Sequence, residues 1–142
     1  MWTKNFLISS SADYPILKFI IENTVYHEDY DSFLEIRDNL GDDGVILAWT
    51  GRSPWARMLI ELAGVERLSL DFYDNRPLVE DLLSSIEKKL DEVYKIAANS
   101  PAEVIWAPDN VTGDVVGPKL FQKEEVIFPL RKQGLLGRIN QL

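Results

Sequence analysis

Cysteine is absent from the 142-residue sequence, and histidine occurs once, as His27. The lack of cysteine excludes disulfides, thiol nucleophiles and thiolate metal sites. A zinc site would need His27 together with carboxylates, but the acidic residues around it, in VYHEDYD, are more simply interpreted as a solvated stretch before a helix. The sequence therefore predicts no metal site and no cofactor.

Basic residues are outnumbered, because 15 Lys and Arg stand against 23 Asp and Glu, which gives a net charge of −8. An acidic surface without a Lys/Arg cluster repels phosphate, so neither nucleic acid nor an anionic membrane is an expected partner. No apolar run approaches the roughly 20 residues that span a bilayer. The N-terminal MWTKNFLISS has too short an apolar run for a signal peptide. We therefore expect a cytoplasmic protein.

The order of the apolar runs predicts a single α/β domain over residues 1–142, in which helices alternate with strands. The runs at 45–49 and 102–107 lack polar alternation, which is typical of strands buried on both faces. Helices are predicted at 12–23, 33–40, 54–63 and 77–99, with a helical turn and a connection at 65–77. The region between the two strands is far too long for a hairpin, so we expect the strands to be parallel.

Local signals mark the ends of two of these helices. Ser53 suits an N-cap, Pro54 suits the first helical position, and Gly64 follows the last apolar residue as a left-handed stop. Gly41 supplies the same kind of stop after the helix at 33–40.

Polar side chains follow both predicted strands. Arg52 and Ser53 come after the first strand, and Asp109, Asn110 and Thr112 come after the second. Parallel strands end at the same rim of a sheet, where ligands bind because loops leave there and the following helices point their N-termini back. We therefore expect a cation and a carboxylate, Arg52 and Asp109, to face one pocket.

A purely structural interpretation of the same residues is open. Asp109 and Asn110 suit an Asx-turn after a strand, and Thr112 suits a helix cap. Trp55 and Trp106 lie on predicted apolar faces, where core packing is the favoured role for a large aromatic side chain.

Two motifs carry a family resemblance. TGRSPWARML, followed one long helix later by PDNVTGDVVGPKLFQK, resembles the uroporphyrinogen decarboxylase superfamily, which includes the methylcobamide:coenzyme M methyltransferases. The resemblance covers about residues 43–130. It implies a (β/α)8 barrel, in which the first motif lines one side of the substrate cleft and Asp109 stands at the acidic exit of a middle strand.

The candidate site follows from the resemblance together with the loop residues. Asp109 is the candidate catalytic acid or base. The candidate substrate-binding residues are Arg52, Ser53, Trp55, Asn110 and Thr112.

The chain also departs from the family pattern. Ile60 stands where the decarboxylases have a functional tyrosine, and the cysteine zinc ligands of the methyltransferases cannot exist here. A complete barrel needs about 250 residues, so 142 residues resemble an incomplete TIM barrel of about half that length. A half-barrel exposes a parallel sheet edge, which predicts either a homodimer that pairs through that edge, the favoured outcome, or a locally rewired fold.

Three functions fit these expectations. The favoured one is a divergent, truncated uroporphyrinogen decarboxylase-like protein, a small-molecule-binding or vestigial domain without the parent chemistry. The second is a lyase or methyltransferase that is active only when a second chain completes the site. The third is a protein interaction module.

Overall fold

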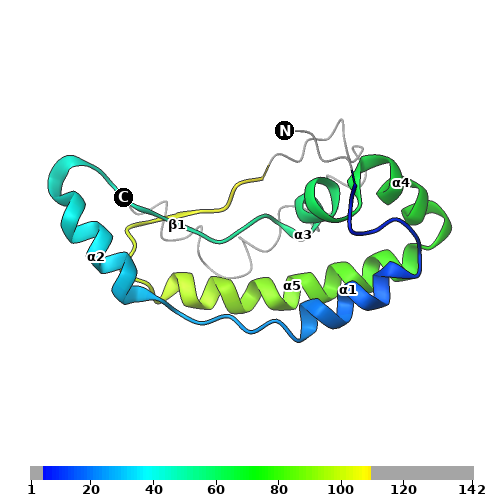
Figure 1. The fold of residues 1–142 in the computed structure, drawn as a ribbon, viewed down its shortest axis with the longest axis horizontal. Helices are drawn as coiled ribbons and strands as arrows, with labels where there is room; N and C mark the ends of the chain where they lie inside the picture. The colour runs from blue at the N-terminus through cyan, green and yellow to red at the C-terminus, as the bar shows by residue number, and fades with distance from the viewer. Residues whose placement is uncertain (1–4, 110–142) are drawn as a thin grey trace.

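Residues 5–109 are described by the computed structural model, and most of them are helical (Figure 1). In chain order the elements are α1 (Asp13–Glu22), α2 (Tyr30–Leu40), the 3-10 turn η1 (Gly41–Asp43), β1 (Leu47–Trp49), α3 (Pro54–Arg57), the π-helical turn η2 (Met58–Leu62), α4 (Gly64–Asp74), α5 (Arg76–Ala98) and β2 (Val104–Trp106). Helices and a parallel pair of strands occur together, so the predicted α/β character is confirmed.

The long helix α5 organises the molecule. It matches the helix predicted at 77–99 and has a proline in its first turn. Its buried apolar residues recur every three or four positions, and they are Val79, Leu82, Ile86, Leu90, Tyr94 and Ala97. Figure 1 shows α5 running along the length of the molecule, where α1, α3 and α4 pack against it. At its other end, the Tyr30 hydroxyl of α2 donates to the Ile96 carbonyl at 2.7 Å.

One apolar core lies between α1, α5 and the α3 to α4 region. Its buried members are Ile8, Tyr14, Leu17, Ile21, Trp55, Met58, Leu59, Leu62, Ala63, Leu68, Val79, Leu82 and Ile86. The segment before α1 is tied to this core by the Ile8 amide, which donates to the Leu62 carbonyl at 2.8 Å. Gly64 begins α4 with a φ of 76°, and a Cβ there would lie 2.5 Å from the Phe6 ring. The predicted left-handed stop is therefore confirmed, and a larger residue at position 64 would collide.

Helix α1 buries one of two apolar faces. The predicted helix is present, although the helical spacing of Ile16, Phe19 and Ile20 belongs to the exposed face. The buried face consists of Tyr14, Leu17 and Ile21. Both faces are apolar, so periodicity alone cannot choose between them.

A buried polar network fixes which face of α1 is inside. Asp71 of α4 is only 1% exposed, and it accepts a hydrogen bond from the Tyr14 hydroxyl at 2.9 Å. Arg67 binds the same carboxylate with two nitrogens, so each oxygen of Asp71 has a partner. Burial, followed by the bond to Asp71, raises the pKa of Tyr14. The network joins α1 to α4 and requires Tyr14 to point inward.

The two strands pair in parallel, as the sequence predicts. In the register, Leu47 lies opposite Val104, Ala48 opposite Ile105, and Trp49 opposite Trp106. The pairing extends one residue further, because the Thr50 amide donates to the Trp106 carbonyl at 3.1 Å. Both strands therefore end on the same side of the sheet.

The prediction that these strands are buried on both faces is wrong. One face carries the large apolar side chains of Leu47, Trp49, Val104 and Trp106, which we call the apolar sheet face. These four side chains are exposed, and Trp49 reaches 63%. Unbroken apolar runs indicate that both faces avoid water, but only the face of Ala48 and Ile105 is half-buried. Core packing of Trp106 is wrong for the same reason, because this side chain is 53% exposed.

Candidate functional site

The loops that follow β1 and β2 touch each other. The Ser53 backbone amide donates a hydrogen bond to Asp109 Oδ1 at 3.2 Å. This contact is possible because the strands are parallel and their carboxyl ends share a rim. The predicted common rim for Arg52 and Asp109 is confirmed by this geometry.

Ser53 caps the helix that follows β1. Its Oγ accepts a hydrogen bond from the Ala56 amide at 3.3 Å, and Pro54 occupies the first turn of α3. Both predicted start signals are therefore confirmed. The Asp109 carboxylate, which follows β2, accepts a hydrogen bond from the Ser53 backbone amide and so stabilises the start of α3.

A cleft of about 350 Å³ opens beside the end of β1. Its size lies near the lower limit of about 300 Å³ for small-molecule sites. The lining comes from the β1 exit, the α3 and η2 region, α5 and the segment after α1. The lining residues are Tyr26, Trp49, Thr50, Gly51, Arg52, Arg57, Glu61, Ile86, Leu90 and Val93.

Arg52 is paired with a carboxylate other than the expected one. Arg52 Nε lies 3.3 Å from Glu61 Oε1, and Arg57 Nε lies 3.6 Å from Glu61 Oε2. Asp109 is instead bound to a backbone amide and does not line the cleft. The expectation that Arg52 and Asp109 face one pocket is therefore corrected: Glu61 is the carboxylate that faces Arg52.

The Arg52 guanidinium is incompletely satisfied. Within residues 5–109, Nη1 of Arg52 is the one buried side-chain nitrogen or oxygen that lacks a hydrogen-bond partner. Buried polar groups nearly always have partners, so Arg52 keeps a donor that no described acceptor satisfies.

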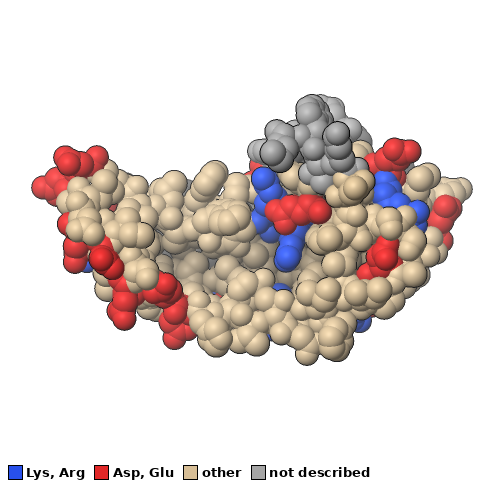
Figure 2. Space-filling model, in the orientation of Figure 1, with Lys and Arg blue, Asp and Glu red and all other residues tan. Residues whose placement is uncertain are grey.

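Charged side chains are unevenly distributed over the face shown in Figure 2. Figure 2 shows acidic side chains gathered at the end of the molecule that α2 forms, whereas basic and acidic atoms lie together near the middle of the same face. The acidic end includes Asp31, Glu35, Asp38, Asp42 and Asp43 of α2 and η1.

Ser53 and Trp55, which the structure describes, do not line the cleft. Trp55 is 5% exposed and packs edge-on against Phe72, with ring centroids 5.4 Å apart, so the core-packing interpretation is confirmed. Asn110 and Thr112 lie outside the described residues. Of the predicted site residues that the structure describes, Arg52 alone lines the cleft.

Sequence reasoning missed Arg57 and Glu61. A signal was available, because residues 57 and 61 are four apart and form an i, i+4 pair on one helical surface. Their meeting with Arg52 was not foreseeable, because Arg52 lies in the loop before α3 whereas Glu61 lies in η2.

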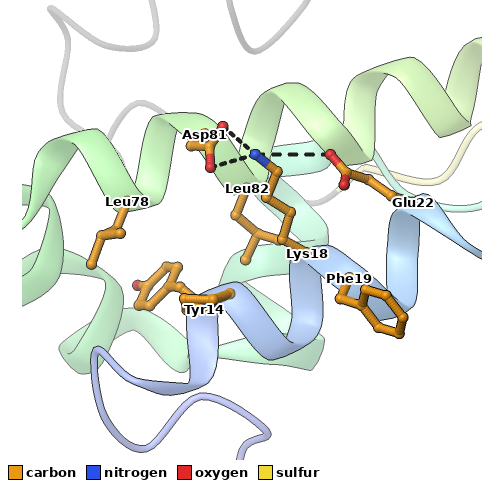
Figure 3. Close-up of a pocket in the computed structure, with 8 residues that line it drawn as sticks. Tyr14, Lys18, Phe19, Glu22, Leu78, Asp81 and Leu82 are labelled. Carbon is orange, nitrogen blue, oxygen red and sulfur yellow. Dashed lines mark hydrogen bonds and ion pairs between the residues drawn. The ribbon is translucent and has the colours of Figure 1, made fainter.

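A second hollow of about 270 Å³ lies between α1 and α5 (Figure 3). Figure 3 shows Lys18 pointing between Asp81 and Glu22. Lys18 Nζ lies 2.7 Å from both oxygens of Asp81 and 3.8 Å from Glu22 Oε1. Because Lys18 is already held by two carboxylates, and the described lining carries one more acidic than basic residue, this hollow is a weaker candidate for an anionic ligand than the cleft beside β1.

Asp109 acts electrostatically on a neighbouring tyrosine. Tyr94 of α5 is 2% exposed. Its burial, together with the negative charges of Asp109 and Asp91, raises the pKa of Tyr94 to about 12. The neutral phenol is therefore favoured beneath the rim.

Comparison of the chain with models of protein families, with curated proteins and with solved structures finds no match. The family resemblance thus stays a prediction based on the two sequence motifs. Residues 5–109 contain no cluster of three or more His, Cys, Asp or Glu side chains placed to hold a metal ion. In the same residues, no helix has both the length and the apolar character needed to cross a membrane.

The charge of Asp109 predicts a measurable effect on Tyr94. Asp109→Asn should lower the pKa of Tyr94 from about 12, while burial keeps it above 10. Tyrosinate absorbance during a pH titration measures the shift, and Tyr94→Phe identifies the signal. In the parent chain, neutral Tyr94 stabilises the fold below pH 10, and this stabilisation is lost as the pH rises through about 12.

The matched control is Asp74→Asn, which removes the same charge at the exposed end of α4. It should leave the pKa of Tyr94 unchanged. An equal shift in both variants would show that Asp109 is not near Tyr94.

Proposed function

We propose that the chain is a divergent relative of the uroporphyrinogen decarboxylase superfamily that binds a small molecule at the rim of β1 and β2. The parent chemistry is absent. The observation that carries the proposal is the cleft at the carboxyl end of β1, where a buried Arg52 nitrogen lacks a partner. Such rims are the usual ligand sites of parallel sheets.

The architecture of residues 47–106 is compatible with part of a (β/α)8 barrel. Two parallel strands are joined by a helical crossover, which is the repeating unit of that fold. The apolar sheet face is what an inner barrel face would look like, because barrel interiors are filled by branched and aromatic side chains. The barrel itself is part of the proposal.

Binding is favoured over catalysis by the position of Asp109. Its Oδ1 holds the Ser53 amide, so the carboxylate ties the two loops together and does not face the cleft. A general acid or base must lie within hydrogen-bond reach of the reacting group. Asp109 is therefore a positioning residue in this proposal.

The proposal predicts stabilisation by a ligand. Thermal unfolding would be followed with tetrapyrroles, corrinoids and small carboxylates, and at least one class should raise the melting temperature. A ligand at 100 times its dissociation constant adds about 2.7 kcal/mol to the free energy of unfolding. Asp109→Ala should weaken binding because it frees the Ser53 loop.

Asp74→Ala serves as the control and should bind like the parent chain. If none of the ligand classes raises the melting temperature, the proposal is contradicted. If Asp109→Ala binds ligand as tightly as the parent chain, the positioning role of Asp109 is contradicted.

The apolar sheet face favours a second candidate function, which is pairing with another copy of the chain. A two-stranded sheet is marginal by itself, and four large apolar side chains on one face are a liability unless they are covered. A second copy offers the same face and the same strand edges, which have no partner strand within residues 5–109. The enzymatic alternative, in which a second chain completes the site, depends on the same association.

Sedimentation over a range of concentrations tests this pairing. A dimer is expected, and Trp106→Lys should shift it toward monomer because a charge enters the apolar contact. Tyr73→Lys is the control, since Tyr73 is 90% exposed on α4, away from the sheet. A chain that stays monomeric at every concentration would exclude both pairing and a shared active site.

A further inference from the structure

Arg52, which lines the cleft beside β1, has a side-chain donor without a hydrogen-bond acceptor among the described residues. A guanidinium carries five N–H donors, and the described partner of Arg52 is Glu61, which lies 3.3 Å from Nε. Nη1 is buried and has no hydrogen-bond partner among the described atoms. Nη1 is enclosed by protein atoms, so a planar anion would reach it only when the guanidinium turns toward the cleft, where Arg and carboxylate match in fork-like geometry.

The charges that line the cleft do not balance. Arg52 and Arg57 are positive, whereas Glu61 is the single acidic residue in the described lining. Their side chains are only 25%, 32% and 44% exposed, so water screens them incompletely. One positive charge is left over in a chain whose net charge is −8. The lining therefore attracts a single anionic group.

Apart from Tyr26, Thr50 and Gly51, the rest of the described wall is apolar. Trp49 supplies a flat aromatic surface from the end of β1, and α5 contributes aliphatic side chains from one face. The α5 residues are Ile86, Leu90 and Val93. Apolar walls with a few placed polar groups are typical of ligand sites, in which the polar groups set the orientation.

Glu61, which lies between Arg52 and Arg57, belongs to the π-helical turn η2. The Ala63 amide reaches back five residues to the Met58 carbonyl at 2.9 Å, so this turn is wider than an α-helical turn. Such turns frequently occur at functional sites. Glu61 already lies between two arginines, and it can remain with Arg57 when another anion approaches Arg52.

We propose that the cleft binds a small aromatic or otherwise apolar monocarboxylate, whose carboxylate is held by Arg52 and whose body packs against Trp49 and α5. This inference rests on the proposed function and narrows its ligand class. A volume of about 350 Å³ suits a compact molecule and is small for a whole tetrapyrrole macrocycle. Glu61 holds Arg57, and Arg52 turns its free donors to the ligand.

Titration calorimetry with naphthoate and with its uncharged amide, naphthamide, tests the carboxylate requirement. Naphthoate should bind at least tenfold more tightly than naphthamide. Arg52→Gln should lower the affinity for naphthoate at least tenfold and leave the affinity for naphthamide unchanged. Arg52→Lys should lie between the two, because it keeps the charge and loses the planar fork. Glu61→Gln should increase the affinity for naphthoate, because it removes the carboxylate that competes for Arg52.

Lys88→Gln is the matched control, since it removes one exposed positive charge from α5 outside the cleft. It should bind naphthoate like the parent chain, and circular dichroism would verify that every variant is folded. Equal affinity for naphthoate and naphthamide, or an unchanged affinity in folded Arg52→Gln, would overturn the inference. If tetrapyrroles or corrinoids bind while naphthoate does not, the inference fails and the proposed function stands. If no ligand binds, both fail.

Discussion

Parallel pairing of β1 with β2 is the constraint on which the candidate site depends. It places the exits of two strands, separated by the whole of α5, on one side of the sheet. The Ser53 amide can then reach Asp109, and the start of α3 is fixed beside the end of β1. Arg52 lies in the short loop between Thr50 and Ser53. The backbone amides of both residues are fixed by hydrogen bonds, which holds the loop in place. An antiparallel pair would place these exits at opposite ends of the sheet.

The helical part of the fold follows closely from local sequence signals. α5 was predictable because its apolar positions recur over 23 residues and a proline stands in its first turn. Ser53 and Pro54 predict the start of α3, and Gly64 predicts the break before α4. α4 was underestimated as a helical turn and a connection because one of its buried positions is occupied by the charged residue Asp71, which interrupts the apolar pattern.

Burial and partner choice were less predictable, for physical reasons. An apolar run indicates that a strand avoids water, but it does not say what covers it, and Trp49 and Trp106 lie on an exposed face. The charge partner of Arg52 is Glu61 in η2, and no short motif links the loop before α3 to that turn. Asp109 was correctly placed at the rim. Its carboxylate binds the Ser53 backbone amide, so it holds the loop before α3 and is not directed at a ligand in the cleft.

Strand direction is also the most direct test of the whole account. Nuclear Overhauser contacts in an isotope-labelled sample would report which backbone atoms of 47–49 face those of 104–106. The account predicts contacts in which Leu47 pairs with Val104 and Trp49 with Trp106, together with a Thr50 amide that is slow to exchange because it donates to the Trp106 carbonyl. Contacts that pair Leu47 with Trp106 would show antiparallel strands and would contradict the common rim.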